Sequence, residues 1–184
     1  MSVESHITYY NLMPIPPVES QTEYFDAGAI RIGVEYRLVN DAISAATEVA
    51  RARGEDEAPP DQPDDRGVSI HVFAVRGGEL WEHLRFDCFQ EDPHYHYVSW
   101  EERRNEMLHL DPVADGDSVA WAIERLRTRL PQMLERAGAA DAARALDPGA
   151  LEAVLPKVAE AAYRARYNHD EQAVLRGALG GAEA

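Results

Sequence analysis

The sequence is poor in the residues that mark disulfide or membrane proteins. Its 184 residues include one cysteine, Cys88, so an intrachain disulfide framework is impossible. No apolar run approaches the roughly 20 residues that a transmembrane helix requires. The first residues lack a basic start followed by an apolar run, so we expect no signal peptide and a cytoplasmic location.

Basic residues are also scarce, with 18 Lys and Arg against 33 Asp and Glu and a formal net charge of −15. A chain this acidic repels phosphate backbones and anionic lipids, so we expect neither a nucleic-acid nor a membrane partner. A basic protein or a neutral or cationic ligand fits better. The P-loop, Gly-x-Gly-x-x-Gly, Gly-x-Ser-x-Gly, Cys-x-x-Cys and His-Glu-x-x-His motifs are absent too, so no common signature assigns a reaction.

Proline content and periodicity divide the chain into three regions. Residues 1–28 are Pro-rich and predict an extended arm that lies across this chain's own surface or a partner's. Residues 29–115 predict an antiparallel sheet domain with one helix, 40–54, and an acidic loop, 55–67. Residues 116–184 predict a helical region that packs on the sheet or on a partner.

Alternation of polar and apolar residues predicts the strands. Residues 29–39 alternate with a period of two and put Glu35 and Arg37 on a polar face, where strand charges usually contact water. Two apolar-rich runs joined by Gly77 and Gly78 predict a β-hairpin, and HYHYVS is a third run. The expected fold class is therefore α+β, an antiparallel β-meander of about four strands packed with C-terminal helices.

From residue 116 onward the apolar residues recur with the period of a helix. Asp117 is a good N-cap for the first helix and Gly138 a good end, with a kink expected at Pro131. Asp147 begins another helix, which Pro156 is expected to break or bend.

The segment DCFQEDPHYHYVSW contains the candidate site. With the Gly77-Gly78 turn at one hairpin tip and a four-residue turn, 90–93, at the next, the strand registry places five side chains on one side of the sheet. These are His83, Arg85, Asp87, His94 and His96. Directly opposed side chains have Cβ atoms roughly 5 Å apart, so the imidazoles and the carboxylate would converge. A slip of one residue on any strand would break the cluster.

His94 and His96 stand one residue apart on one strand face, which lets two imidazoles bind one ion. Asp87 is the expected third ligand. The candidates for a fourth ligand are His83, Glu101 and His109. Two histidines and one carboxylate with open positions are typical of non-haem iron sites and of many zinc hydrolases. The expected cofactor is therefore one divalent ion, iron, zinc or manganese.

The same cluster has two metal-free interpretations. One is a hydrogen-bonded polar edge of the sheet, in which Asp87 accepts from His96, and Arg85 pairs with Glu101 or Asp92. The other is a metal-free active site in which Asp87 and a histidine form an acid–base pair. The catalytic candidates are His83, Arg85 and Asp87.

Two short motifs resemble known families. HYHYVSWE is similar to the core of the first cupin motif, in which two histidines one residue apart precede a glutamate, and this resemblance implies His94, His96 and Glu101 as metal ligands. RFD and DPHYHY, followed by a helix after residue 116, resemble small bacterial toxins of the TumE-like kind. That resemblance implies a short antiparallel sheet with a closing helix.

Three functions remain open. The first is a small accessory or ligand-binding subunit of a larger bacterial enzyme assembly, which contacts a protein partner or a second copy through the arm, 1–28, and the C-terminal helices. The second is a small metal-dependent enzyme of the hydrolase or oxygenase type, with the metal on Asp87, His94 and His96. The third is a toxin-like or regulatory protein paired with a basic protein.

Overall fold

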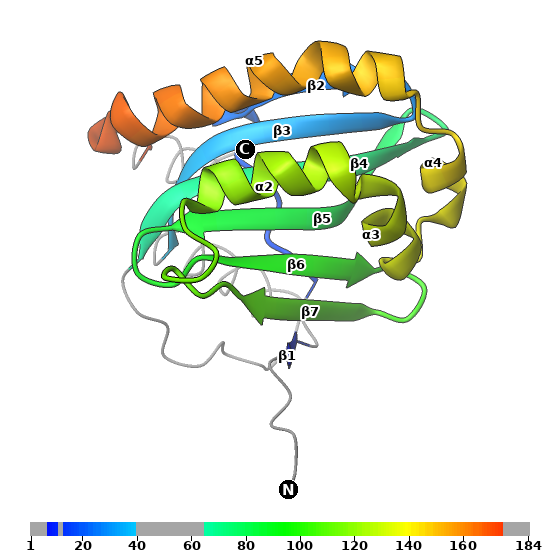
Figure 1. Ribbon diagram of the computed structural model, residues 1–184, viewed down its shortest axis with the longest axis horizontal. Helices are drawn as coiled ribbons and strands as arrows, with labels where there is room; N and C mark the ends of the chain where they lie inside the picture. The colour runs from blue at the N-terminus through cyan, green and yellow to red at the C-terminus, as the bar shows by residue number, and fades with distance from the viewer. Residues whose placement is uncertain (1–6, 11–12, 40–64, 175–184) are drawn as a thin grey trace, which may run out of the picture.

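The computed structural model describes residues 7–10, 13–39 and 65–174, and they form one antiparallel sheet with helices on one face (Figure 1). The sheet has seven strands in the order β1-β7-β6-β5-β4-β3-β2, and every neighbouring pair is antiparallel. The strands are β1 (Ile7–Tyr10), β2 (Glu23–Ala27), β3 (Ile30–Leu38), β4 (Arg66–Arg76), β5 (Glu79–Phe89), β6 (His94–Ser99) and β7 (Arg104–His109).

The helices follow the sheet in the chain and cover one of its faces. They are α2 (Ser118–Thr128), α3 (Leu130–Arg136), α4 (Ala140–Arg144) and α5 (Pro148–Tyr167), and a short 3-10 helix, η1 (Glu19–Gln21), precedes β2. Helix α2 packs against β5, and α5 packs against β2, β3 and β4 (Figure 1). The C-terminal helices therefore cover this chain's own sheet. In the described part of the chain, none is both long and apolar enough to cross a membrane.

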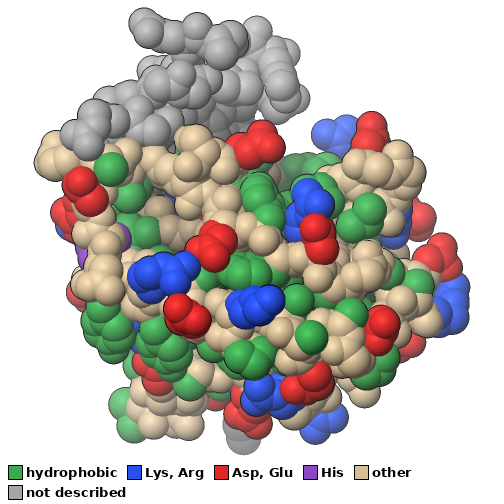
Figure 2. Space-filling model, turned by 90° about the horizontal axis from the view of Figure 1, so that it is seen from above, with side chains coloured by type: hydrophobic (Ala, Val, Ile, Leu, Met, Phe, Trp, Pro, Cys, Tyr) green, Lys and Arg blue, Asp and Glu red, His purple; other side chains and the backbone are tan. Residues whose placement is uncertain are grey.

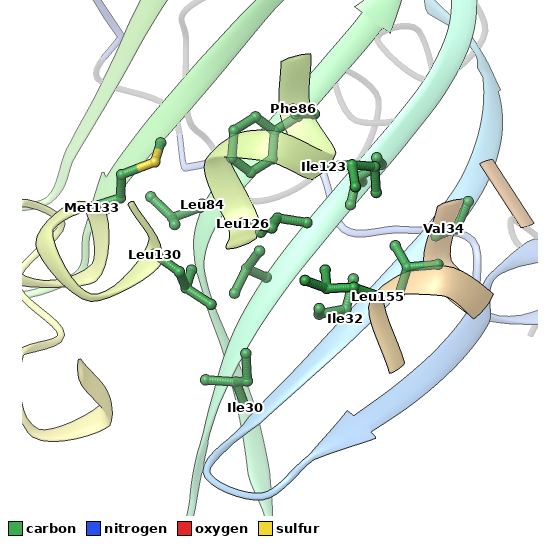
Figure 3. Close-up of a cluster of buried hydrophobic side chains, with 14 of the residues drawn as sticks. Ile30, Ile32, Val34, Leu84, Phe86, Ile123, Leu126, Leu130, Met133 and Leu155 are labelled. Carbon is green, nitrogen blue, oxygen red and sulfur yellow. The ribbon is translucent and has the colours of Figure 1, made fainter. Parts of the chain in front are cut away.

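A continuous apolar core lies between the helices and the sheet (Figure 3). The inward face of β3 supplies Ile30, Ile32 and Val34, as its alternation predicts. Phe86 of β5 and Leu126 of α2 are also buried, at 1 % and 0 % exposure. Burying such side chains is the main favourable term in folding, so this core holds the two layers together.

Charges of both signs cover the helical side of the molecule. Arg164 pairs with Glu23 of β2, and Arg166 pairs with the N-cap carboxylate Asp117. Figure 2 shows acidic and basic side chains interspersed on the surface seen from above. Exposed pairs of this kind contribute little to stability, but they join the end of the last long helix to the sheet edge and to the start of α2.

The expected α+β class with an antiparallel sheet is present, but the expectation of about four strands is wrong, because the sheet has seven. Strands β1 and β2 lie within residues 1–28, where the prolines predicted only an extended arm. Strand β7, RNEMLH, has no clean alternation of apolar residues. Edge and near-edge strands such as these are stabilised by pairing with a neighbour, which a local pattern does not reveal.

The registry between β4 and β5 differs from the expected one because of a β-bulge. Ala74 lies opposite Trp81 as predicted, but the register shifts between Val72 and Phe73, so Val72 lies opposite Leu84 instead of His83. His83 is the extra residue. Because the bulge adds one residue to β5, the β4 residues from Val72 back to the start of the strand lie on the opposite face from the expected one. Val72 is therefore on the apolar side of the sheet.

The registry between β5 and β6 also differs from the expected one, by two residues. Asp87 pairs with His94 and Arg85 with His96, whereas Asp87 was expected opposite His96. Side chains repeat with a period of two along a strand, so this shift leaves Asp87, His94 and His96 on one face.

The helix boundaries largely follow their capping residues. Asp117 accepts a hydrogen bond from Ala120 N, and Asp147 accepts from two backbone N–H groups at the start of α5. The helix predicted from Asp117 is interrupted between α2 and α3, just before Pro131, which stands in the first turn of α3. Pro156 lies inside a continuous α5. The predicted helix 40–54 and most of the acidic loop lie outside the described residues.

Gly67 allows β4 and β5 to approach closely, and we expect Gly67→Ala to destabilise the sheet. A Cβ at this position would lie 2.6 Å from the Cys88 carbonyl oxygen and 2.8 Å from Phe89 Cα, which are backbone atoms that cannot rotate away. The expected loss is about 1–3 kcal/mol, measured by urea unfolding. Gly149→Ala, inside the first turn of α5, is the control: its Cβ would lie 3.3 Å from Asp147 Oδ1, a side-chain atom that can shift, so its urea midpoint should fall much less than that of Gly67→Ala. Equal midpoints for Gly67→Ala and wild type would contradict this explanation.

Candidate metal centre

The face of the sheet away from the helices carries a buried group of polar side chains, here called the polar cluster. Its members come from five adjacent strands, β3 to β7, and all except His94 are less than a tenth exposed. They are Glu35, Arg37, Ser69, His71, Glu82, Arg85, Asp87, His94, His96 and Asn105. The side chains of Glu35 and Arg37, which were expected to contact water, are 1 % and 8 % exposed.

A Pro-rich segment, residues 13–18, covers the polar cluster and is here called the strap. Arg37 donates to the carbonyl of Pro16 at 3.2 Å, and Arg85 donates to the carbonyl of Ile15 at 3.3 Å. The segment before β2 passes behind the sheet in Figure 1. Proline has no backbone N–H, so the strap brings acceptors to the two arginines while adding few donors of its own. The strap thus lies across this chain's own surface.

His71 joins two carboxylates at the centre of the polar cluster. Its Nδ1 lies 2.6 Å from Glu82 Oε1 and its Nε2 lies 3.1 Å from Glu35 Oε1. Burial opposes the charged ring, but the two carboxylates raise the pKa of His71 above its ordinary value. Burial also opposes the charge on Glu35, and Arg37 and His71 nevertheless lower its pKa to about 2. These groups therefore form an ion-paired network.

Asp87 and the two histidines of β6 converge beside this network. The Nε2 atoms of His94 and His96 lie 3.4 and 3.3 Å from the same oxygen, Asp87 Oδ2. Ser69 donates to Asp87 Oδ1 at 2.5 Å, and Arg85 donates to Oδ2 at 2.9 Å. One ligand atom from each of the three residues lies within 4.8 Å of the others, so the group can hold a metal ion.

The other ring nitrogen of each histidine is already committed to a hydrogen bond. His94 Nδ1 lies 2.7 Å from the carbonyl oxygen of Asp92, and His96 Nδ1 lies 2.8 Å from Asn105 Oδ1. Both partners are acceptors, so both Nδ1 atoms carry the proton. The Nε2 lone pair of a neutral ring then points to the Asp87 carboxylate, and two acceptors that face each other need a cation between them.

The pKa values in the site show an ionised Asp87 and two histidines that shift in opposite directions. Burial alone would raise the pKa of Asp87, but Arg85 and the two histidines hold it well below its ordinary value. Burial and the nearby Arg85 lower the pKa of His96 to about 4, so that ring is neutral at pH 7. Burial opposes protonation of His94 as well, but the hydrogen bond to Asp87 raises its pKa. The site thus attracts a positive charge to one position, between His94 and Asp87.

His96 Nε2 has no hydrogen-bond partner among the residues that the structure describes. Its approach to Asp87 Oδ2 at 3.3 Å lacks hydrogen-bond geometry. In a tetrahedral centre with bonds of about 2.1 Å, two ligand atoms are about 3.4 Å apart. The separations of Asp87 Oδ2 from the two Nε2 atoms match that value, and all three ligand atoms lie within 4.8 Å of one another.

The other candidate residues are not among the three converging side chains. His83 stands at the bulge with its Nδ1 3.1 Å from the carbonyls of Val98 and Ala137, on the helical side. Glu101 is exposed in the turn between β6 and β7, apart from Asp87, His94 and His96. His109 lies opposite His94 in the sheet but is exposed, and its Nδ1 is 2.7 Å from Asp92 Oδ1. In the described part of the chain, none of the expected fourth ligands belongs to the group of Asp87, His94 and His96, here called the triad, although the rings of His94 and His109 lie 6.1 Å apart.

Sequence reasoning missed several residues of the polar cluster. His71 was expected on the apolar side, because the bulge that moves it opposite Arg85 has no signature in the sequence. Ser69, which holds Asp87 Oδ1, changes face for the same reason. Asn105, which orients His96, lies on an unpredicted strand. The charge alternation in residues 29–39 was the one available signal for Glu35.

The chain belongs to a known protein family. Residues 24–162 match the model of a domain of unknown function, DUF7700, so the family covers the sheet from β2 onward and most of the helical layer. No curated protein and no solved structure matches the chain. The family assignment supports neither the resemblance to cupins nor the resemblance to TumE-like toxins.

We expect Glu35→Gln to destabilise the protein and to flatten its response to acid. The substitution leaves Arg37 without its buried carboxylate and His71 with Glu82 alone, at an expected loss of about 3–5 kcal/mol near pH 7. The folded pKa of Glu35 is about 2, so its contribution is complete above its unfolded pKa of about 4.3 and is lost as the pH falls toward 2. Urea unfolding at several pH values measures both effects.

The control for this substitution is Glu23→Gln, which removes an exposed carboxylate paired with Arg164. It should change the free energy of unfolding by less than about 1 kcal/mol. If Glu35→Gln were as stable as wild type near pH 7, the ion-paired role of Glu35 would be wrong. It would also be wrong if Glu35→Gln and wild type lost stability equally between about pH 4.3 and 2.

Proposed function

We propose that this protein is a small metal-dependent enzyme that binds one divalent transition-metal ion on Asp87, His94 and His96. The observation that carries the proposal is the convergence of two imidazole Nε2 atoms on one carboxylate oxygen, with both Nδ1 atoms already hydrogen bonded. A metal-binding histidine in proteins almost always donates its second nitrogen to an acceptor in this way.

The donor set favours iron, zinc or manganese. Two imidazoles and one carboxylate are borderline to hard ligands, and three protein ligands leave coordination positions for water or substrate. A metal bound there would supply Lewis-acid or redox chemistry of the hydrolase or oxygenase type. The chain's own contribution would be to keep Asp87 ionised through Arg85 and Ser69, and to keep His96 neutral by burial.

A buried charged network beside the triad supports a functional role rather than a purely structural one. Ion pairs taken out of water seldom stabilise a protein more than apolar side chains of similar volume would. Here Glu35, His71, Glu82 and Arg85 occupy a face that aliphatic residues could fill. Clusters of perturbed titratable groups are typical of sites that bind ligands or catalyse reactions.

The accessory-subunit function predicts that the arm, 1–28, and the C-terminal helices contact a partner. In the described residues, the strap covers the polar cluster and the helices cover the apolar face of the same chain. A protein partner, or a toxin-like or regulatory role, therefore stays a prediction without an added supporting observation.

The test of the proposed function is elemental analysis by mass spectrometry of untagged protein purified without chelator. We expect close to one iron, zinc or manganese ion per wild-type chain, and loss of this metal from the His94→Ala/His96→Ala double variant, because the ion would keep only Asp87. A free metal concentration of 100 times Kd should also raise the free energy of unfolding by about 2.7 kcal/mol.

The control for the double variant is His169→Ala, which removes a histidine that stacks on Tyr36 beside α5, away from the triad. It should retain the metal. If folded wild-type protein contained no metal and took up none when titrated with iron(II), zinc or manganese, the proposed function would be wrong. Equal metal content in wild type and the double variant would also contradict it.

A further inference from the structure

One buried carboxylate holds the turn that precedes His94. Asp65 is 3 % exposed and stands just before β4. Its two oxygens accept four backbone hydrogen bonds. The donors are the N–H groups of Arg66 at 2.8 Å, Gln90 at 3.1 Å, Glu91 at 3.1 Å and Asp92 at 2.8 Å.

Three of these donors are consecutive and belong to the turn between β5 and β6, residues 90–93. Successive N–H groups that point to one place form a site for an anion, and Asp65 supplies that anion from within the chain. A carboxylate has about four lone-pair positions and no donor, so it satisfies all four N–H groups at once. Asparagine would place an NH₂ group against one or more of them.

The turn carries the acceptor that orients His94. The carbonyl of Asp92 lies 2.7 Å from His94 Nδ1 and sits in the peptide unit that joins Asp92 to Pro93. On one side of this unit, Asp92 N–H is held by Asp65. On the other side, Pro93 has a restricted φ, and its carbonyl accepts from Leu110 N at 2.9 Å. The direction of the Asp92 carbonyl therefore depends on Asp65.

We propose that Asp65 is a positioning residue of the candidate metal centre. Through the turn, it holds the Asp92 carbonyl in place, and this carbonyl keeps the proton of His94 on Nδ1 and points Nε2 to Asp87. His96 is oriented separately, by Asn105 of β7, so Asp65 controls one histidine of the pair. The effect on metal binding rests on the proposed function, whereas the effect on the His94 ring does not.

The test uses the full chain with Asp65→Asn and two measurements. In NMR spectra of the ¹⁵N-labelled protein, the hydrogen-bonded Nδ1–H signal of His94 should shift or disappear, while that of His96 should stay. In titrations with zinc, Kd should rise roughly 10–100-fold, as is typical when the partner of a metal-binding histidine is lost. The matched control is Asp147→Asn, which changes a carboxylate that also accepts two backbone N–H bonds, at α5.

Each outcome distinguishes this proposal from the proposed function. If wild type binds no zinc, iron(II) or manganese, the proposed function fails, and the His94 signal alone decides the role of Asp65. An unchanged His94 signal, or unchanged Kd in a chain that binds metal, would overturn the role of Asp65. If Asp65→Asn does not fold, Asp65→Glu replaces it, because the longer carboxylate cannot meet all four N–H groups in the same positions. Asp65→Glu should give the same change in the His94 Nδ1–H signal and the same rise in Kd.

Discussion

The carboxylate of Asp87 is the group on which the second face of this sheet depends. A buried negative charge is costly unless it is paired and hydrogen bonded, and Asp87 is 2 % exposed. Arg85 supplies the opposite charge and Ser69 the hydrogen bond. Arg85 also donates to the Ile15 carbonyl of the strap, so the residue that neutralises Asp87 also connects the sheet to the strap. The imidazoles of His94 and His96 complete the surroundings of the same oxygen.

The two faces of the sheet are covered in different ways. Helices α2 and α5 bury an aliphatic face, where packing alone decides which side chains fit. The strap buries a charged face, where each cation needs a carboxylate and each donor an acceptor. The pairing of His71 with Glu35 and Glu82 satisfies that requirement near the middle of the sheet. A face this constrained leaves few ways to arrange its side chains, which favours a precise geometry around Asp87, His94 and His96 on β5 and β6.

Much of the candidate site could be predicted from the alternation of residues along β5 and β6. Asp87, His94 and His96 share a face in the structure, although the pairing differs by two residues from the expected one, because a shift of two preserves the face. His83 was misplaced and His71 overlooked because of a single bulge. Glu35 was expected in contact with water because the cover over its face comes from the Pro-rich segment.

The sequence by itself determined the α+β class, the Gly77-Gly78 hairpin, the helix caps and the shared face of the triad. These features follow from periods of 2.0 and 3.6 residues and from the geometry of turn and cap residues, which are local. Only the tertiary structure decided the number of strands, the bulge, the strap and the hydrogen bonds from Asp65 to the turn 90–93. Each of those joins residues far apart in the chain, and the free energy that selects them comes from burial and pairing with neighbours that no local pattern specifies.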